Sequence, residues 1–413
     1  MSALTVYLRS EPVGTLAQDE SGMLQFTYAA EWLGRDDATP LSRMLPLSPT
    51  PCAHKFARSF FAGILPEEGP RAVIARILGI SDGNDFAMLE RIGGECAGAV
   101  SLFPEGQYPR PVESRVSVLD ERDIIAIVEE LPRRPLMAGE EGIRLSLAGA
   151  QDKLPVIMDA DSIALPLGNT PSTHILKPEP KHFPGLVANE AFCMDLARRV
   201  GLKVAGTAVR VFGKTPCLVV RRYDREQGAA GTIRLHQEDF CQALGRPPER
   251  KYQQEGGPTV RDCVGLLREW STTPVLDILA FVDALTFNLL IGNADAHGKN
   301  YSMIYAAGAR RLAPLYDLVS TIAWPELSTR LAMNIGHGKH ANDLNPAHFK
   351  SLADDCDLGW PMVRERIRNL ADKMIAAAND RVALIESSVP VMFPKVADMV
   401  RERCERMLKL IVR

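Results

Sequence analysis

The sequence predicts an α+β fold divided into several domains, and three observations lead to this prediction. The chain has 413 residues, more than a single compact core accommodates. Residues 112–235 contain short apolar runs bounded by turn residues, a pattern typical of strands, with one clear helix. Residues 237–413 contain longer apolar patterns typical of helices. We therefore expect a small N-terminal domain at 1–108, a strand-rich domain at 109–236 and a mainly helical domain at 237–413.

The first part of the chain is expected to be a small mixed domain. Residues 5–9 and 24–28 have the composition of strands, a helix is predicted from Ser59, and a further strand is predicted at 101–103. Three prolines and one glycine in residues 104–111 predict a linker. The sequence of this part contains no candidate catalytic residue that we can identify.

The middle part is predicted to contain a hairpin, a third strand and a helix. The hairpin is expected from residues 154–158 and 163–167, and the third strand from residues 173–177. The helix is expected at 185–200, because it follows a proline and Gly201 closes it. The apolar side of this helix is predicted to carry Leu186, Phe192, Leu196 and Val200.

The C-terminal part is predicted to contain a long buried helix followed by a hairpin. Residues 275–291 are mostly apolar, and Gly292 is the kind of residue that ends a helix. Residues 301–305 and 312–316 predict the two strands of the hairpin. The loop between these strands is expected to contain Gly308, Arg310 and Arg311.

The polar loop before this hairpin contains the strongest candidate for a catalytic site. Asn300 precedes the first strand and Asp317 follows the second, so both are expected at the open end of the hairpin and could hold magnesium. Asp295 could accept a proton from an acceptor hydroxyl, and we take Asp295 and Lys299 as the catalytic candidates. A surface turn rich in Asn, Gly and Asp would have the same composition. A calcium loop is disfavoured, because Ile304 occupies the position that requires Glu.

A lysine, a glutamate and a loop of small residues suggest a nucleotide site. Lys177 ends a predicted strand and Glu190 lies early in the next helix; in protein kinases such a pair holds the lysine against nucleotide phosphates. Two separate solvated side chains are the alternative. The backbone of residues 146–153 could approach a phosphate, although an ordinary hairpin turn has the same composition. The phosphate-binding candidates in this loop are Ala148, Gly149, Ala150 and Gln151.

The segment that joins the strand-rich and helix-rich parts is the candidate for adenine binding. Gln237, Glu238 and Phe240 lie there, where a backbone segment that crosses between two lobes could hydrogen-bond an adenine. A helix N-terminus rich in acidic residues is the alternative, because the helix dipole favours negative charge at that end.

Composition and charge exclude several other classes of protein. The net charge of −3 and the pI near 6.3 do not fit a protein that binds nucleic acid over its whole surface. Eight cysteines without a Cys-x-x-Cys pair predict buried free thiols in a reducing compartment. The N-terminus lacks the apolar core of a signal peptide, and we find no run of about 18 uninterrupted apolar residues. We therefore expect a cytoplasmic protein.

The order of these motifs resembles that of the HipA family, the serine/threonine protein kinase toxins of bacterial type II toxin–antitoxin systems. The resemblance covers nearly the whole chain. It rests on residues 146–153 (Ser-Leu-Ala-Gly-Ala-Gln-Asp-Lys), 175–178 (Ile-Leu-Lys-Pro), 189–190 (Asn-Glu), 236–239 (His-Gln-Glu-Asp), 251–252 (Lys-Tyr), 256–258 (Gly-Gly-Pro), 292–300 (Gly-Asn-Ala-Asp-Ala-His-Gly-Lys-Asn) and 315–317 (Leu-Tyr-Asp). It implies a two-lobed, protein-kinase-like fold that uses ATP and Mg²⁺.

The resemblance also implies roles and partners. Asp295 would be the catalytic base, Asn300 and Asp317 would hold magnesium, Lys177 would contact phosphates, and Glu238 and the backbone near residue 240 would meet adenine. Ser146 matches the serine whose autophosphorylation ejects the glycine-containing loop and inactivates the kinase. Known members phosphorylate an aminoacyl-tRNA synthetase, such as glutamyl-tRNA synthetase, and are neutralised by a HipB-like helix-turn-helix antitoxin that binds operator DNA. Two alternatives stay open, a catalytically silent corepressor of such an antitoxin and a small-molecule phosphotransferase.

Overall fold

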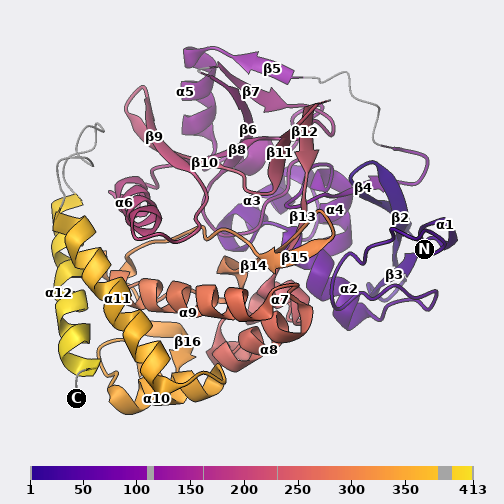
Figure 1. The fold of residues 1–413 in the computed structure, drawn as a ribbon. Coiled ribbons are helices and arrows are strands. Elements are labelled where there is room, and N and C mark those ends of the chain that lie inside the picture. The colour runs from indigo at the N-terminus through magenta and orange to yellow at the C-terminus, as the bar shows by residue number, and fades with distance from the viewer. Residues whose placement is uncertain (1, 109–115, 161, 230, 380–392, 412–413) are drawn as a thin grey trace. The chain divides into compact units, whose positions relative to one another are not determined.

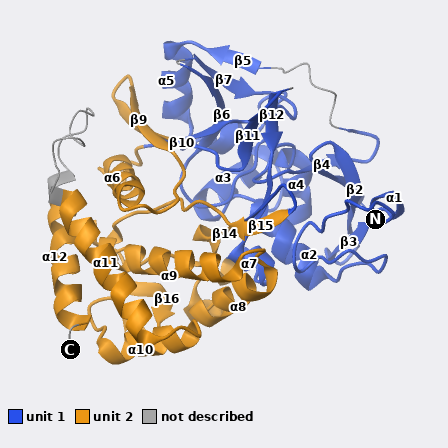
Figure 2. Ribbon diagram, viewed as in Figure 1, with its two compact units in different colours: residues 1–178, 220–248, 304–308 blue, residues 179–219, 249–303, 309–413 orange. Residues whose placement is uncertain are grey.

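The fold is α+β, as the sequence predicts, and the chain forms two compact units (Figures 1 and 2). The computed structural model describes residues 2–108, 116–160, 162–229, 231–379 and 393–411. Unit 1 comprises Met1–Pro178, Val220–Pro248 and Ile304–Gly308, and unit 2 comprises Glu179–Val219, Glu249–Met303 and Ala309–Arg413. The chain passes between the units at five points, two of which lie inside the strands β10 (Thr215–Arg221) and β14 (Ser302–Ala306).

Unit 1 begins with an antiparallel sheet in the strand order β3-β2-β1-β4. The strands are β1 (Ser2–Leu8), β2 (Glu11–Gln18), β3 (Leu24–Tyr28) and β4 (Val100–Pro104), and the accompanying helices are α1 (Ala30–Leu33), α2 (His54–Phe61), α3 (Glu68–Leu78) and α4 (Asp85–Ile92). Leu4 lies opposite Leu16, and both are fully buried on one face of the sheet. The prediction of a helix from Ser59 was wrong about its start. Ser59 lies inside α2, where its hydroxyl donates to the Lys55 carbonyl at 2.7 Å.

The second sheet of unit 1 contains the antiparallel strand order β5-β7-β6-β8. Its strands are β5 (Val116–Leu119), β6 (Leu154–Asp159), β7 (Ser162–Pro166) and β8 (His174–Pro178). The predicted hairpin and third strand are confirmed. The helix α5 (Glu121–Glu130) was missed, although Asp120 and Asp123 form a capping box at its start, a signal that the sequence contains. The rest of unit 1 includes β11 (Arg225–Gly228), β12 (Gly231–Arg234), β13 (His236–Asp239) and α7 (Phe240–Ala243).

A buried cluster of charges joins two distant segments of unit 1. The carboxylate of Glu95 binds Arg222 at 3.2 Å and Arg225 at 2.5 Å. Arg222 also binds Asp224 at 2.7 Å, and Asp224 accepts the backbone N–H of Gly98 at 2.6 Å. Burial alone would raise the pKa of Glu95, but the neighbouring guanidinium charges outweigh it and hold that pKa below its ordinary value. These carboxylates are therefore ionised and paired inside the protein.

Unit 2 is built around one apolar helix, α9 (Pro274–Ile291), which packs against α8, α11 and α12 (Figure 1). Its other helices are α6 (Leu186–Arg199), α8 (Val260–Trp270), α10 (Pro346–Asp355), α11 (Trp360–Asn379) and α12 (Phe393–Ile411). The helix α9 is long and apolar enough to cross a membrane, but 67% of it is buried within the protein. Burial by neighbouring helices is typical of a core helix that is hydrophobic all round. The expected helices at 185–200 and 275–291 are confirmed as α6 and α9.

The strands of unit 2 bear on the predicted hairpin, which differs in part from its prediction. They are β9 (Thr207–Phe212), β15 (Ala309–Leu312), β16 (Arg330–Ile335) and β17 (Gly338–His340), with most of β10 and the start of β14. The expected strand at 301–305 is confirmed as β14. The expected strand at 312–316 was wrong, because β15 ends at Leu312 and contains Arg310 and Arg311 instead of leaving them in the loop. Pro314 has no N–H with which to extend the pairing.

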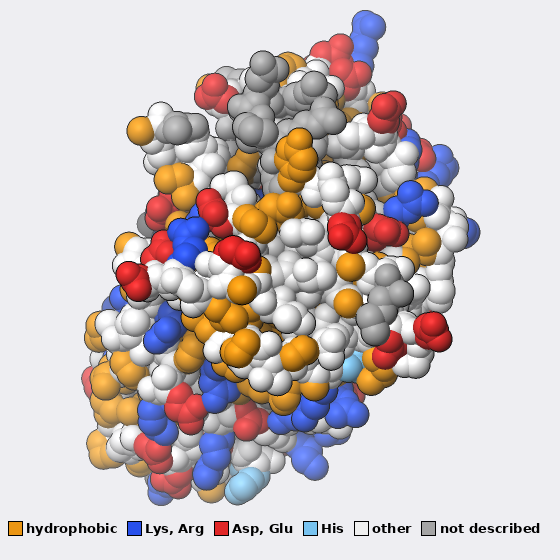
Figure 3. Space-filling view, turned by 90° about the vertical axis from the view of Figure 1, so that its right-hand side faces the viewer, with side chains coloured by type: hydrophobic (Ala, Val, Ile, Leu, Met, Phe, Trp, Pro, Cys, Tyr) orange, Lys and Arg blue, Asp and Glu red, His pale blue; other side chains and the backbone are white. Residues whose placement is uncertain are grey.

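The cysteine side chains and the surface charges agree with what the sequence predicts. All eight cysteines are free thiols and seven are buried, as predicted. Figure 3 shows Lys, Arg, Asp and Glu side chains interspersed on one face, which agrees with the small net charge. Of the predicted linker at 104–111, Pro104 ends β4, residues 105–108 form a turn and irregular chain, and residues 109–111 lie outside the described residues. Short 3₁₀ helices span Ala62–Ile64, Pro135–Met137, Pro248–Arg250, Gln253–Glu255, Gly298–Asn300 and Thr321–Ala323.

Candidate functional site

The candidate catalytic loop begins where α9 ends, at Gly292. This residue has a left-handed backbone with φ 73°, and its N–H donates to the Leu289 carbonyl at 3.2 Å. A Cβ atom at this position would lie 2.4 Å from the Ile322 side chain. Both the backbone conformation and the close packing therefore require glycine. The predicted helix end is confirmed.

Asn293 fixes the loop from inside. Its Nδ2 donates to Asn288 Oδ1 at 2.8 Å, and its Oδ1 accepts the N–H of Asp295 at 3.0 Å. Within residues 291–300, Asp295 is exposed while every other residue is buried. The buried asparagines hold the backbone, and the loop presents a single carboxylate to solvent. Sequence reasoning gave Asn293 no role, because its partner lies in the helix core.

The two predicted magnesium ligands lie side by side in unit 2. Asn300 Nδ2 donates to Asp317 Oδ2 at 2.9 Å, and Asn300 Oδ1 accepts the N–H of His297 at 3.0 Å. The expected adjacency is therefore observed, although the strand that was to position Asp317 ends five residues earlier. Asp317 instead has a left-handed backbone with φ 59°, an uncommon conformation for a residue with a side chain. Strain of this kind often occurs at functional sites.

The donor set formed by Asn300 and Asp317 fits magnesium. The cation prefers oxygen ligands and usually takes one or two protein groups together with water and substrate phosphates. A carboxamide oxygen has two lone pairs, so Asn300 Oδ1 can keep its bond to His297 and also face a cation. Among the described residues there is no group of three His, Cys, Asp or Glu suited to a metal, and this site does not need one.

Tyr316 contacts the end of the loop that lies next to Asn300. Its hydroxyl donates to the Lys299 carbonyl at 2.7 Å and also lies 2.7 Å from the Ser302 hydroxyl. Tyr316 precedes Asp317 in the sequence, and Lys299 precedes Asn300. The hydrogen bond between Tyr316 and Lys299 therefore joins the neighbours of the two candidate magnesium ligands. Lys299, the second catalytic candidate, is buried in the short 3₁₀ helix Gly298–Asn300.

Tyr252 contacts the loop from a distant part of the sequence. Its hydroxyl donates to Asp295 Oδ1 at 2.7 Å. Sequence reasoning included the Lys-Tyr pair in a motif but gave it no role. The only available signal was the motif itself, because the contact joins positions 43 residues apart.

The predicted phosphate-binding loop lies in unit 1 and is packed against its N-terminal part. Ser146 is fully buried; its hydroxyl donates to the Ile64 carbonyl at 2.8 Å and its N–H to the Glu95 carbonyl at 2.9 Å. Gly149 has φ 105° and bridges to Pro66. Ala148 accepts a hydrogen bond from the Lys153 ammonium at 2.8 Å, while Ala150 is exposed and Gln151 half-buried. The glycine is thus required by its conformation.

The predicted lysine–glutamate pair is divided between the two units. Lys177 is buried at the end of β8 in unit 1, and Glu190 is buried in the first turns of α6 in unit 2. Burial of both side chains disagrees with the alternative of two solvated surface groups. Their pairing stays a prediction.

The adenine-binding candidates occupy β13 and the start of α7 in unit 1. The carboxylate of Glu238 is fully buried and accepts hydrogen bonds from the Ser42 hydroxyl at 2.5 Å, the Arg43 N–H at 3.1 Å and the Tyr305 hydroxyl. Burial raises the pKa of Glu238 to about 7, although these hydrogen bonds act in the opposite direction. Gln237 accepts a hydrogen bond from Tyr223, and Phe240 is fully buried in α7. Contact with adenine stays a prediction for all three.

The raised pKa of Glu238 predicts a pH-dependent stability. The unfolded carboxyl has a pKa near 4.5, so between pH 4.5 and about 7 the folded protein keeps a proton that the unfolded chain releases. The free energy of unfolding should therefore fall as pH rises through this window, by about 3 kcal/mol from this group. Glu238→Gln, which stays neutral, should lack this component when urea unfolding of both proteins is followed from pH 5 to 8. Parallel pH curves for the two proteins would contradict the assignment.

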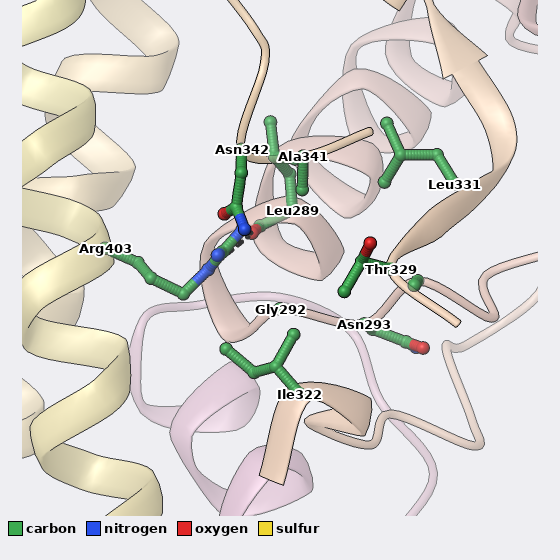
Figure 4. A pocket seen from close by; sticks show the side chains of 10 residues that line it. Leu289, Gly292, Asn293, Ile322, Thr329, Leu331, Ala341, Asn342 and Arg403 are labelled. Atoms are coloured by element: carbon green, nitrogen blue, oxygen red, sulfur yellow. Dashed lines mark hydrogen bonds between the residues drawn. The ribbon is translucent and has the colours of Figure 1, made fainter. Parts of the chain in front are cut away.

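A small pocket is lined in part by the start of the candidate catalytic loop in unit 2 (Figure 4). It is lined by Leu289, Gly292, Asn293, Ala294, Ile322, Thr329, Leu331, Ala341, Asn342 and Arg403. Arg403 reaches from α12 to the last turn of α9, where its Nη2 donates to the Leu289 carbonyl at 2.7 Å and its Nε at 3.2 Å (Figure 4). A cation at the C-terminal end of a helix is favoured by the helix dipole. Burial lowers the pKa of Arg403 to about 10, so the guanidinium stays charged at neutral pH.

Removal of this cap should loosen the end of α9. Arg403→Ala is expected to lower the free energy of unfolding by about 1–3 kcal/mol, because a buried carbonyl loses two charge-assisted hydrogen bonds. Arg401→Ala is the matched control, since Arg401 lies on the same helix and its ion pair with Asp398 is at the surface. Urea unfolding of both variants measures the difference. Equal losses would show that Arg403 contributes no more than a surface arginine.

Comparison with known proteins identifies the class to which this fold and site belong. Residues 4–103 match the HipA N-terminal domain, and residues 145–382 match the HipA-like C-terminal domain. The chain therefore belongs to the HipA family, and the resemblance inferred from its motifs is confirmed. The division into domains at 1–108, 109–236 and 237–413 stays a prediction.

Individual relatives extend over nearly the whole chain. "Putative kinase Y4mE" of Sinorhizobium fredii is 47% identical and covers 91% of this chain and 90% of that protein. "Serine/threonine-protein kinase toxin HipA" of Shewanella oneidensis is 30% identical, and the match covers 99% of this chain and 96% of that protein. A solved structure of the Shewanella oneidensis toxin–antitoxin system HipA, HipB and its operator DNA superimposes with a TM-score of 0.87 at 28% identity, over 99% of this chain and 98% of that one.

Proposed function

We propose that this protein is a serine/threonine protein kinase that transfers the γ-phosphate of ATP to a protein serine with Mg²⁺ as cofactor. The observation that supports the proposal most is the exposed carboxylate of Asp295 on a loop that is otherwise buried, in the same unit as the bonded pair Asn300 and Asp317. Phosphoryl transfer requires a proton acceptor and oxygen ligands for magnesium, and these three side chains supply both.

The proposed reaction uses each candidate in one role. Asp295 accepts the proton of the serine hydroxyl while the serine oxygen forms a bond to the γ-phosphorus. The bond between the γ-phosphorus and the bridging oxygen breaks, and ADP leaves. Asn300 and Asp317 would hold Mg²⁺, which would supply positive charge to neutralise the phosphate oxygens. Lys177 contacts the phosphates and Glu190 orients Lys177.

The remaining candidates bind the nucleotide or support catalysis. Lys299 belongs to the same loop as Asp295 and adds positive charge beside the phosphates. The backbone of residues 148–151 approaches the phosphates. Gln237, Glu238 and the backbone near Phe240 bind adenine.

Autophosphorylation of Ser146 is proposed to switch the kinase off. The hydroxyl of Ser146 is buried against the Ile64 carbonyl, and a phosphoserine carries a charge of about −1.5 to −2. Such a charge is disfavoured beside a carbonyl oxygen and beside bound ATP phosphates. The loop would therefore move outward and lose its nucleotide-binding conformation.

The proposed partners follow from the family. We propose a HipB-like helix-turn-helix antitoxin, since the similar Shewanella oneidensis structure contains HipA, HipB and operator DNA. Contact with operator DNA would occur mainly through that antitoxin, in agreement with the net charge of −3. The protein substrate is proposed to be an aminoacyl-tRNA synthetase such as glutamyl-tRNA synthetase, whose phosphorylation would halt translation in the cytoplasm and induce growth arrest.

A labelling experiment tests this proposal. The purified chain is incubated with γ-labelled ATP and Mg²⁺, with and without EDTA, and phosphopeptides are located by mass spectrometry. Phosphate on Ser146 that disappears with EDTA supports a kinase, and Ser146→Ala controls for other acceptors.

ATP binding without any transfer to protein would instead favour a silent corepressor. Transfer to sugars or antibiotics but not to protein would favour a small-molecule phosphotransferase. Phosphoproteomics after brief expression then identifies the cellular substrate.

A further inference from the structure

The segment at residues 251–258 contains a motif to which the proposed reaction gives no role, and it packs against the catalytic loop within unit 2. The contact is the hydrogen bond from the Tyr252 hydroxyl to Asp295 Oδ1, at 2.7 Å. An ionised carboxylate only accepts hydrogen bonds, so the phenol must be the donor. Hydrogen bonds to a charged acceptor are stronger than those between neutral groups. Tyr252 is therefore coupled directly to the proposed base.

The ring of Tyr252 is held in place by two charged or polar neighbours. His297 packs edge-on against it, with 5.3 Å between ring centroids and 80° between ring planes. The ammonium of Lys251 lies 5.5 Å from the centroid of the same ring, within the range of a cation–π contact. The hydroxyl at the end of the ring therefore has a defined position relative to the loop.

A tight turn with two glycines positions the backbone of Tyr252. Its carbonyl accepts the N–H of Gly257 at 2.9 Å, and Gly256 has a left-handed backbone with φ 86°. A Cβ atom at position 257 would lie 2.6 Å from the Arg250 carbonyl oxygen, so no side chain fits there. The next residue, Gln253, accepts the N–H of Asn334 in β16 at 2.8 Å. The Gly-Gly pair thus serves to present Tyr252.

The backbone and the side chain of Asp295 are fixed by different parts of unit 2. The N–H of Asp295 is bound by Asn293 within the loop, but this bond does not restrain rotation of the carboxylate. The terminal torsion of an aspartate is broad, so the direction of its oxygens needs a further contact. The hydroxyl of Tyr252 supplies that contact.

We propose that Tyr252 is the positioning residue of Asp295, an inference that rests on the proposed role of Asp295 as the base. By binding Oδ1, the phenol sets the rotation of the carboxylate toward the incoming serine hydroxyl. Tyr252 keeps its own proton throughout and takes no part in bond making. General bases act within hydrogen-bond reach of the proton that they accept, so a loss of orientation lowers the rate of transfer.

A double-mutant cycle tests this role. The variants are Tyr252→Phe, Asp295→Asn and the double variant, with Tyr108→Phe as the control because Tyr108 is 65% exposed and lies in unit 1. Single-turnover transfer from γ-labelled ATP to the full-length chain is measured over a range of ATP concentrations. Tyr252→Phe should lower the maximal rate about tenfold and leave the ATP concentration for half-maximal rate unchanged. In the Asp295→Asn background, it should have no further effect.

The cycle distinguishes a positioning role from a purely structural one. Equal losses from Tyr252→Phe in both backgrounds, or a raised ATP requirement, would overturn the positioning role while leaving the kinase activity established. Unfolding by urea shows whether each variant keeps its fold. A wild-type chain that binds ATP but transfers no phosphate would overturn the proposed function and, with it, the role of Tyr252.

Discussion

Asp295→Asn is expected to lower the rate of phosphoryl transfer by about 10²–10⁴-fold, the contribution of a positioned general base. The substitution keeps the shape of the side chain, and its amide oxygen can still accept the hydroxyl hydrogen bond from Tyr252. It removes only the capacity to take a proton at neutral pH. The affinity for ATP should change little, because no nucleotide contact is proposed for the side chain of Asp295 itself. Single-turnover labelling measures the rate, and equilibrium binding measures the affinity.

The control for this variant is Asp372→Ala, which removes an exposed carboxylate from α11 in the same unit. It should transfer phosphate at the wild-type rate. If Asp295→Asn retained more than about a third of the wild-type rate, Asp295 could not be the base. The proton of the serine hydroxyl would then have to pass to solvent or to a phosphate oxygen.

Glu95→Gln is expected to destabilise unit 1 by about 3–5 kcal/mol, the cost of breaking a buried ion pair by removing one partner. Glu95 and Arg222 are fully buried, with side chains 1% and 2% exposed. Without the carboxylate charge, Arg222, Arg225 and Arg234 would lose a shared partner, and Asp224 would remain to pair with the first two. Because the Glu95 carbonyl also accepts the N–H of Ser146, the proposed phosphate-binding loop should loosen as well.

Urea unfolding measures this loss, and hydrogen exchange at the amide of residue 146 measures the loosening. Glu90→Ala is the matched control, because Glu90 is an exposed carboxylate on the neighbouring helix α4. The double variant Glu95→Gln/Arg222→Met should lose less stability than the sum of the two single variants, since it removes both partners. A loss below about 1 kcal/mol for Glu95→Gln would show that the cluster contributes no more to stability than a surface ion pair does.

The candidate site shows how a correct expectation can rest on an incorrect element. The hairpin argument placed Asn300 beside Asp317, and the structure has them in contact. Yet the second strand ends at Leu312, and the position of Asp317 depends on a left-handed backbone and on the bonds of Tyr316. Proline chemistry could have predicted the early strand end. The contacts of Tyr316 could not be read from its neighbours in the sequence.

Several contacts in the site and elsewhere in the two units could not be predicted from any local pattern of residues. Tyr252 contacts Asp295 across 43 positions, Arg403 reaches Leu289 across 114, and Glu95 meets Arg222 across 127. The partner of such a side chain is known only from the packed structure of the whole unit. The motif that contains Tyr252 was visible, but its function was not.

The sequence by itself determined the helix at 275–291, its end at Gly292 and the order of polar residues in the loop that follows. These features depend on side-chain periodicity and on backbone freedom within a few residues, so neighbours along the chain decide them. Only the tertiary structure decided that Asp295 is exposed among buried neighbours and that Tyr252 donates a hydrogen bond to its carboxylate. Burial and hydrogen bonds between distant residues arise from the packing of the whole unit, which no local pattern of residues contains.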